Sequence, residues 1–185
     1  MTGVDAAAFR LAAGQFATGI LVVSTRLDGV SHSMTVSAFT SVSLDPVLVL
    51  FCAEKIARFH EAVLSSGQWA VSVLDEDSEK VSRWLATRGR PLEDQLAGIP
   101  WHPGPLTGAP ILDGALSALE CRTTAVHDGG DHSIVVGEVI GVTPPRPGGK
   151  PLVFYASQYR HLADNADAGN AGAGNGNAGA GTGAG

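Results

Sequence analysis

The chain has 185 residues, of which 44% are hydrophobic and 16% are charged, and this balance excludes a disordered chain. A net charge of -6 with scattered Lys and Arg residues argues against a nucleic-acid partner, because neutralising phosphates needs a basic face. No apolar run reaches the length of a membrane span, and the N-terminus lacks the features of a secretory signal. We therefore expect a cytoplasmic, globular domain that binds a small molecule.

The N-terminal part predicts a short helix followed by antiparallel strands. Apolar residues recur at helical spacing from Phe9 to Ala17, with Asp5 as the expected N-cap and Gly19 beyond the end. An Asp28-Gly29 pair, typical of hairpin turns, separates the first two strands. The strands predicted here are Ile20–Ser24, Val30–Ser37 and Ser41–Cys52, the last with Pro46 at an edge or bend.

The middle of the chain predicts two helices around one strand. The first helix runs from Ile56 to Leu64 and stops at Gly67, and Trp69 to Leu74 is a strand. A second helix follows Asp77 or Ser78, with an apolar stripe that ends near Gly89. Residues 91–113 lack sustained periodicity, and so long a loop indicates a functional or oligomer-contacting element.

The C-terminal part predicts a long hairpin. Leu116–His127 and Ser133–Thr143 read as strands joined by Asp128-Gly129-Gly130-Asp131, and Leu152–Tyr155 is the last strand. Residues 163–185 are rich in Ala, Gly and Asn, which predicts a disordered tail. Many short strands with few helices favour a closed antiparallel barrel over a parallel sheet.

Three local patterns could carry chemistry, and each has a plainer explanation. Thr35 to Ser43 is rich in small hydroxyl residues that let a backbone approach a ligand, although such a strand can simply face solvent. Lys55 and Arg58 are expected in the first turn of a helix, where they would form an anion site or be solvated beside Glu54 or Glu61. His132 follows a Gly-Asp turn and is either functional or an exposed turn residue.

Four segments in a fixed order resemble one known family. They are Gln15-Phe16-Ala17-Thr18-Gly19, the run from Met34 to Pro46, Ala118-Leu119-Glu120-Cys121, and the run from Gly130 to Val139. Together they are similar to the flavin reductase-like family of FMN-binding split barrels, which includes the reductase components of two-component flavin monooxygenases. The resemblance extends from Phe9 to Leu162, and the family's usual second proline is replaced here by Val47.

The resemblance implies a six-stranded antiparallel Greek-key split β-barrel with short flanking α-helices over residues 1–162, assembled as a homodimer. It also implies an NAD(P)H-dependent flavin reductase that transfers hydride from a nicotinamide to FMN or FAD and supplies reduced flavin to a separate monooxygenase. Two alternatives stay open because fold does not fix function. One is a non-catalytic flavin- or haem-binding module, and the other is an FMN enzyme that reduces an organic substrate.

The same resemblance implies the site residues. His132 would be the catalytic residue, placed against the nicotinamide and oriented by Asp131. The other residues implied at the cofactor site are Thr35, Val36, Ser37 and Ala38 at the isoalloxazine, Ser41 and Ser43 farther along, Ala53, Lys55, Arg58 and Phe59 at the phosphate, and Tyr155, Tyr159 and Arg160 near the flavin or the dimer contact. Core packing is the alternative for Phe59, and core or interface packing is the alternative for both tyrosines. No metal is expected, because His127, His132 and His161 match no regular ligand spacing.

Overall fold

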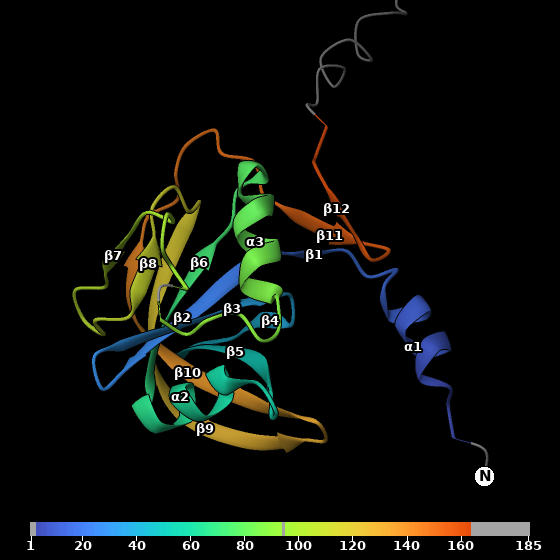
Figure 1. Cartoon of the computed structure of the whole chain (residues 1–185), viewed down its shortest axis with the longest axis horizontal. Helices are drawn as coiled ribbons and strands as arrows, with labels where there is room; N and C mark the ends of the chain where they lie inside the picture. The colour runs from blue at the N-terminus through green and yellow to red at the C-terminus, as the bar shows by residue number, and fades with distance from the viewer. Residues whose placement is uncertain (1–2, 94, 164–185) are drawn as a thin grey trace, which may run out of the picture.

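The computed structural model describes residues 3–93 and 95–163, and Figure 1 shows a curved sheet with helices at its sides. The elements in chain order are α1 (Ala6–Ala13), β1 (Thr18–Gly19), β2 (Leu21–Leu27), β3 (Val30–Val36), β4 (Phe39–Leu44), β5 (Val47–Glu54), α2 (Arg58–Ser66), β6 (Gln68–Val73), the short 3-10 helix η1 (Glu76–Ser78), α3 (Glu79–Ala86), β7 (Trp101–Pro103), β8 (Pro110–Leu112), β9 (Ser117–Gly129), β10 (His132–Thr143), β11 (Val153–Tyr155) and β12 (Gln158–Arg160). None of the helices in these ranges has the length and apolar character needed to cross a bilayer.

The main sheet is antiparallel and has seven strands in the order β3-β2-β6-β9-β10-β5-β4. Its two edge strands, β3 and β4, are consecutive in the chain, and only Ser37 and Ala38 separate them. The sheet therefore curls until its two edges approach each other at this link. The Cys52 N–H donates to the Ala38 carbonyl at 3.0 Å, which ties the link to β5.

The expectation of a mainly β fold with few helices is confirmed, but the strand count is corrected. The structure has a seven-stranded sheet with unjoined edges among the described residues, and not a closed six-stranded barrel. One reason is that the strand predicted over Ser41–Cys52 is two strands, β4 and β5. They reverse at Asp45-Pro46 and pair from Leu44 opposite Val47. Pro46 has no N–H to donate to a ladder, so the chain turns there.

Aromatic rings fill the space inside the curl of the sheet. Phe51 of β5 and Trp69 of β6 are fully buried, with ring centroids 4.8 Å apart in an edge-to-face arrangement. A Cβ atom on Gly137 of β10 would lie 2.4 Å from the Trp69 ring, so only glycine leaves room for the indole. The helix α2 covers this core with Phe59 and Val63, and it ends at Gly67 in the left-handed conformation, as the sequence predicts.

A second apolar cluster lies between α3, β2 and the segment predicted to be an irregular loop. Leu85 of α3 packs with Leu96, Leu112 and Leu152. Within that segment β7 and β8 form a short hairpin, which the sequence analysis missed. The segment is therefore part of the folded body, and it fixes where α3 lies.

The N-terminal helix and the last strands lie beside this body. Helix α1 begins at Asp5, whose carboxylate accepts from the Ala8 N–H at 3.0 Å, but it ends at Ala13, before the predicted end near Gly19. No residue of α1 is buried, and Figure 1 shows the helix projecting away from the sheet. The predicted tail lies outside the described residues from position 164 onward.

Candidate functional site

A cavity of about 540 Å³ opens between β3, the start of α2 and the end of α3. This volume is in the range typical of small-molecule sites. Its walls are the β3 segment from His32 to Ala38, the turn from Ile56 to Phe59, the segment from Leu85 to Arg90, and the side chains of Cys52, Glu54, Leu92, Gln95 and His132. The strand and helix residues among them belong to elements that pack on the core, whereas residues 87–92 lie outside helices and strands.

The β3 wall is fastened to α3 by a side-chain hydrogen bond. The Thr35 hydroxyl donates to the Ser82 carbonyl at 2.7 Å. Because its hydrogen is used in this bond, the Thr35 oxygen can offer a ligand only its lone pairs. Small side chains at Ser37 and Ala38 continue this wall, as the hydroxyl-rich sequence from Thr35 to Ser43 suggests.

Arg90 is held in the wall by its own hydrogen bonds. Its guanidinium donates to the Thr87 carbonyl at 2.8 Å, to the Ser33 carbonyl, and to the Gln95 side-chain oxygen at 3.3 Å. The Nε of Arg90 is buried and has no hydrogen-bond acceptor among the described residues. The charge of Arg90 is thus fixed beside the cavity without a carboxylate partner in the described ranges.

Arg58 lies next to Arg90 at the start of α2. Its guanidinium donates to the Arg90 carbonyl, and no ion pair with Arg58 occurs within residues 3–93 and 95–163. Burial lowers the pKa of Arg90, and the neighbouring charge of Arg58 lowers it further. The N-cap of α2 is Ala57, which has no side chain to cap the first N–H groups of the helix. Two adjacent cations at an uncapped helix start favour a bound anion.

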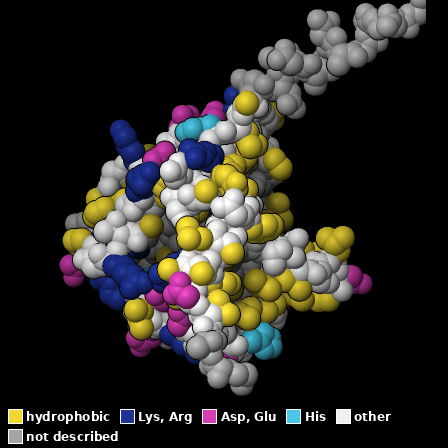
Figure 2. Space-filling model, turned by 90° about the vertical axis from the view of Figure 1, so that its right-hand side faces the viewer, with side chains coloured by type: hydrophobic (Ala, Val, Ile, Leu, Met, Phe, Trp, Pro, Cys, Tyr) yellow, Lys and Arg dark blue, Asp and Glu magenta, His cyan; other side chains and the backbone are white. Residues whose placement is uncertain are grey.

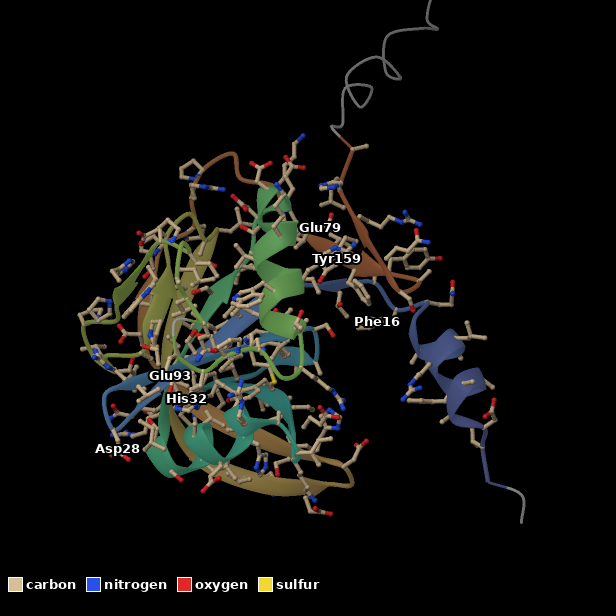
Figure 3. All side chains as sticks on the ribbon, viewed as in Figure 1. Phe16, Asp28, His32, Glu79, Glu93 and Tyr159 are labelled. Atoms are coloured by element: carbon tan, nitrogen blue, oxygen red, sulfur yellow. The ribbon has the colours of Figure 1, made fainter. Side chains whose placement is uncertain are left out.

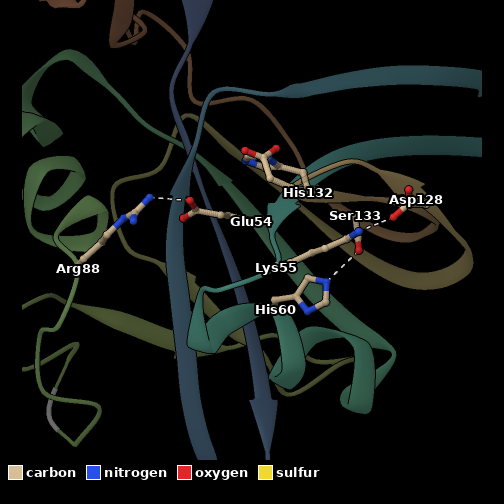
Figure 4. A network of polar contacts seen from close by, with 8 residues as sticks. Glu54, Lys55, His60, Arg88, Asp128, His132 and Ser133 are labelled. Carbon is tan, nitrogen blue, oxygen red and sulfur yellow. Dashed lines mark hydrogen bonds and ion pairs between the residues drawn. The ribbon is translucent and has the colours of Figure 1, made fainter. Parts of the chain in front are cut away.

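His132 also lines the cavity, from the first position of β10. Its Nδ1 lies 2.7 Å from a carboxylate oxygen of Asp131, which leaves Nε2 as the nitrogen available to a ligand. This hydrogen bond and the charge of the imidazole lower the pKa of Asp131, so Asp131 stays ionised and holds the ring. Glu54 is the partner of His132 across the ladder, and it forms a 2.5 Å ion pair with Arg88 (Figure 4).

Lys55 does not join Arg58, although the sequence places both in the first turn of a helix. Helix α2 begins only at Arg58, so Lys55 lies in the preceding turn and faces the β9–β10 hairpin. The Lys55 ammonium pairs with Asp128 (Figure 4), and the backbone N–H of Lys55 donates to the Asp131 carbonyl at 2.9 Å. The expectation that both cations lie in the first turn of a helix is therefore wrong, and Lys55 is not among the residues that line the cavity.

The structure brings about half of the expected site residues together. Those that line the cavity are Thr35, Val36, Ser37, Ala38, Arg58, Phe59 and His132. Phe59 also packs in the hydrophobic core, which is the alternative expected for it from the sequence. Ala53 is fully buried beneath the wall, and Ser41 and Ser43 lie along β4 outside the lining.

The three C-terminal residues lie elsewhere, on β11 and β12. Tyr155 bonds to Gln15 at 2.9 Å, and Arg160 is exposed on β12. The Tyr159 hydroxyl lies 2.8 Å from the Ser82 hydroxyl, and Figure 3 shows Tyr159 beside the C-terminal strands, apart from His32. Tyr159 and Thr35 thus bond to the same residue of α3, Tyr159 to the Ser82 hydroxyl and Thr35 to the Ser82 carbonyl.

Several cavity residues are not among those predicted from the sequence. Arg88 and Arg90 flank Gly89 directly after a helix, and two cations at this place could have indicated an anion site as well as the end of the helix. His32 also lines the cavity, where burial lowers its pKa and Arg58 lowers it further. Nothing local marks Gln95, which is buried because residues distant in sequence surround it.

These features fit a flavin nucleotide. Val36 and Phe59 line the cavity with apolar groups that can contact a flat ring, while Thr35 and the backbone of the Ser37–Ala38 link can match its polar edges. Arg58 and Arg90, beside the uncapped start of α2, suit a phosphate. The donor set therefore agrees with the group that the sequence implies.

Comparisons with known proteins agree with this chemistry. Residues 13–163 match the family model described as the flavin reductase like domain. Over 157 residues the chain is 41% identical to HsaB, the reductase subunit of a flavin-dependent monooxygenase from Mycobacterium tuberculosis, with 84% of this chain and 82% of that protein covered. It is 38% identical over 152 residues to SmoA, an FMN reductase (NADH) from Agrobacterium fabrum, with 82% and 83% covered.

A solved structure shows the same similarity in three dimensions. The NADH:FAD oxidoreductase SgcE6 of Streptomyces globisporus C-1027, solved in complex with NAD and FAD fragments, matches with a TM-score of 0.82 and 37% identity. The match covers 88% of this chain and 96% of that chain.

Proposed function

This chain belongs to the flavin reductase-like family, and from that membership we propose that it is an NADH-dependent flavin reductase that supplies reduced flavin to a separate monooxygenase. The observation that carries the proposal is one cavity that both His132 and the Arg58–Arg90 pair line. A nicotinamide and a flavin phosphate need these two kinds of group. The relatives named above are the reductase subunit of a flavin-dependent monooxygenase, an FMN reductase that uses NADH, and an NADH:FAD oxidoreductase.

The reaction transfers two electrons and needs little acid–base machinery. When bound, the flavin supplies the hydride acceptor, so that NADH, a proton and oxidised flavin give NAD⁺ and reduced flavin. The protein contributes mainly by positioning the reactants. The wall from Thr35 to Ala38 and Phe59 would hold the ring, Arg58 would hold the phosphate, and His132, fixed by Asp131, would orient the nicotinamide.

The remaining expectations are part of the same proposal. Residues 1–162 form the family domain, and the two edges of the sheet that meet at the Ser37–Ala38 link support a split barrel with Greek-key connections. Exposed apolar side chains on and after α1, including Phe9, Leu11 and Phe16, support a homodimer. Figure 2 shows hydrophobic side chains gathered over the face on which α1 lies. The cytoplasmic location stays a prediction from the sequence.

Anaerobic reduction assays test the activity. Purified protein is mixed with FMN, FAD or riboflavin and with NADH or NADPH, and loss of flavin absorbance is followed. We expect rapid reduction with NADH. If flavin binds but none of the combinations turns over, the chain is a flavin-binding module and the proposal is refuted.

A further inference from the structure

The cations of the cavity occupy two separate places. Arg58 and Arg90 lie together at the start of α2, joined through the Arg90 carbonyl. Arg88 is directed instead to Glu54, which lies beside His132 across the β5–β10 ladder (Figure 4). All three arginines line the same cavity, where Glu54 is the one carboxylate among the described lining residues. The cavity wall therefore carries an excess of positive charge in a chain whose net charge is -6.

One phosphate monoester would use only the Arg58–Arg90 pair. A diphosphate that links two nucleosides is longer and spreads its charge over two groups, so it can reach Arg88 as well. We propose that Arg88, together with Arg58 and Arg90, binds the diphosphate of a dinucleotide, and that Glu54 holds Arg88 beside the cavity until this ligand arrives. The inference rests on the proposed function, because FAD and NADH are the two dinucleotides that the reaction offers.

The ion pair of Arg88 is easy to exchange. The Arg88 side chain is 74% exposed and Glu54 is 26% exposed, so water screens the pair and it contributes little to stability. A diphosphate can accept two parallel hydrogen bonds from the Arg88 guanidinium. A single carboxylate that is exposed to water offers no better geometry. Glu54 also repels an anion beside it. Exchange of Glu54 for the diphosphate as the partner of Arg88 therefore favours binding of the dinucleotide.

The test compares ligands that differ in their phosphates. Dissociation constants for FAD, FMN and riboflavin are measured by flavin fluorescence with Arg88→Gln, Glu54→Gln and the double variant. Arg122→Gln is the matched control, because Arg122 is 60% exposed and pairs with Glu138 outside the cavity. Thermal unfolding verifies that each variant is folded.

If FAD provides the diphosphate, Arg88→Gln should weaken FAD binding about tenfold relative to FMN and leave riboflavin unchanged. Glu54→Gln should strengthen FAD binding severalfold, and this gain should disappear in the double variant. The control should change nothing. Arg90→Lys, which keeps the charge, should preserve the preference for FAD more fully than Arg88→Gln does.

Steady-state kinetics identify the other source. If NADH provides the diphosphate, flavin binding stays unchanged, while Arg88→Gln raises the KM for NADH about tenfold relative to reduced nicotinamide mononucleotide. Either selective loss supports the site. Equal losses for riboflavin and FAD, or no change with any dinucleotide, overturn it. A wild-type protein that binds FAD but reduces no flavin would refute the proposed function while leaving this binding test valid.

Discussion

Replacement of His132 by alanine separates the binding of the two reactants. The imidazole lines the cavity, its Nδ1 is engaged by Asp131 at 2.7 Å, and the side chain is 40% exposed. Only Nε2 is left for the nicotinamide, so the variant loses one positioning contact in a partly hydrated place. Such a contact contributes about 1.4 to 2.7 kcal/mol to the transition state, and we expect the kcat/KM for NADH to fall about ten- to a hundredfold.

The assay follows both reactants in the same variant. Because we assign His132 to the nicotinamide and Arg58 to the flavin phosphate, the dissociation constant for FMN should stay within about threefold of wild type, a change of under about 0.7 kcal/mol. If His132 only holds the nicotinamide, saturating NADH restores most of the anaerobic reduction rate. A rate that stays low indicates a role in ring alignment or proton delivery. Normal reduction at every NADH concentration would make His132 an ordinary exposed turn residue and refute the assignment.

Two further predictions concern partly buried polar contacts of Asp75 and Tyr159. Burial alone raises the pKa of Asp75, but the Ser78 hydroxyl and Arg146 outweigh it and hold the pKa below its usual value. The stabilisation by the ionised Asp75 is therefore complete above the pKa of the unfolded state, near pH 4, and is lost as pH falls through the lower pKa of the folded state. In urea unfolding at pH 7, Asp75→Asn should lower the free energy of unfolding by about 1 to 2 kcal/mol, and in stronger acid the variant and the wild type should become equally stable. An equal loss at pH 7 and pH 2 would contradict this. Tyr159→Phe should lower stability by about 1 kcal/mol, because the buried Ser82 hydroxyl loses its partner, and should leave FMN affinity within about threefold. A tenfold loss of FMN affinity would return Tyr159 to the cofactor site.

Elements with local signals could be predicted from the sequence. The β9–β10 hairpin follows from its Gly-rich turn, and the end of α2 follows from Gly67, because each depends on the conformations that a few adjacent residues allow. The short strands could not be predicted in this way. Thr18 pairs with Phe154, so β1 exists only because a partner more than a hundred residues away lies beside it. In contrast, β12 and the β7–β8 hairpin pair with neighbours close in sequence, but each strand has only three residues, which is too short for an alternating pattern to stand out.

The site residues also divide into those with a local signal in the sequence and those without one. The wall from Thr35 to Ala38 and the position of His132 are contained in single segments, and the family resemblance located both. Lys55 and Arg58 do not lie together because α2 begins two residues later than the sequence predicts. The Lys55 side chain therefore contacts the β9–β10 hairpin, whereas Arg58 lines the cavity. The adjacency of Arg58 and Arg90 depends on how α3 packs on β3, which no local pattern encodes.

The wall that carries Arg88 and Arg90 differs physically from the other walls of the cavity. The strands β3 and β5 are fixed by ladder hydrogen bonds, whereas the segment after α3 is attached to β3 through the buried side chain of Gln95. Gln95 accepts from the Ser33 N–H at 3.2 Å and donates to the Ser31 carbonyl, and its own carbonyl receives the Trp84 indole N–H at 2.7 Å. The position of the arginines therefore depends on a few side-chain bonds and not on the register of the sheet. We therefore expect substitutions in this segment to change which anion the cavity prefers while the sheet that carries His132 stays intact.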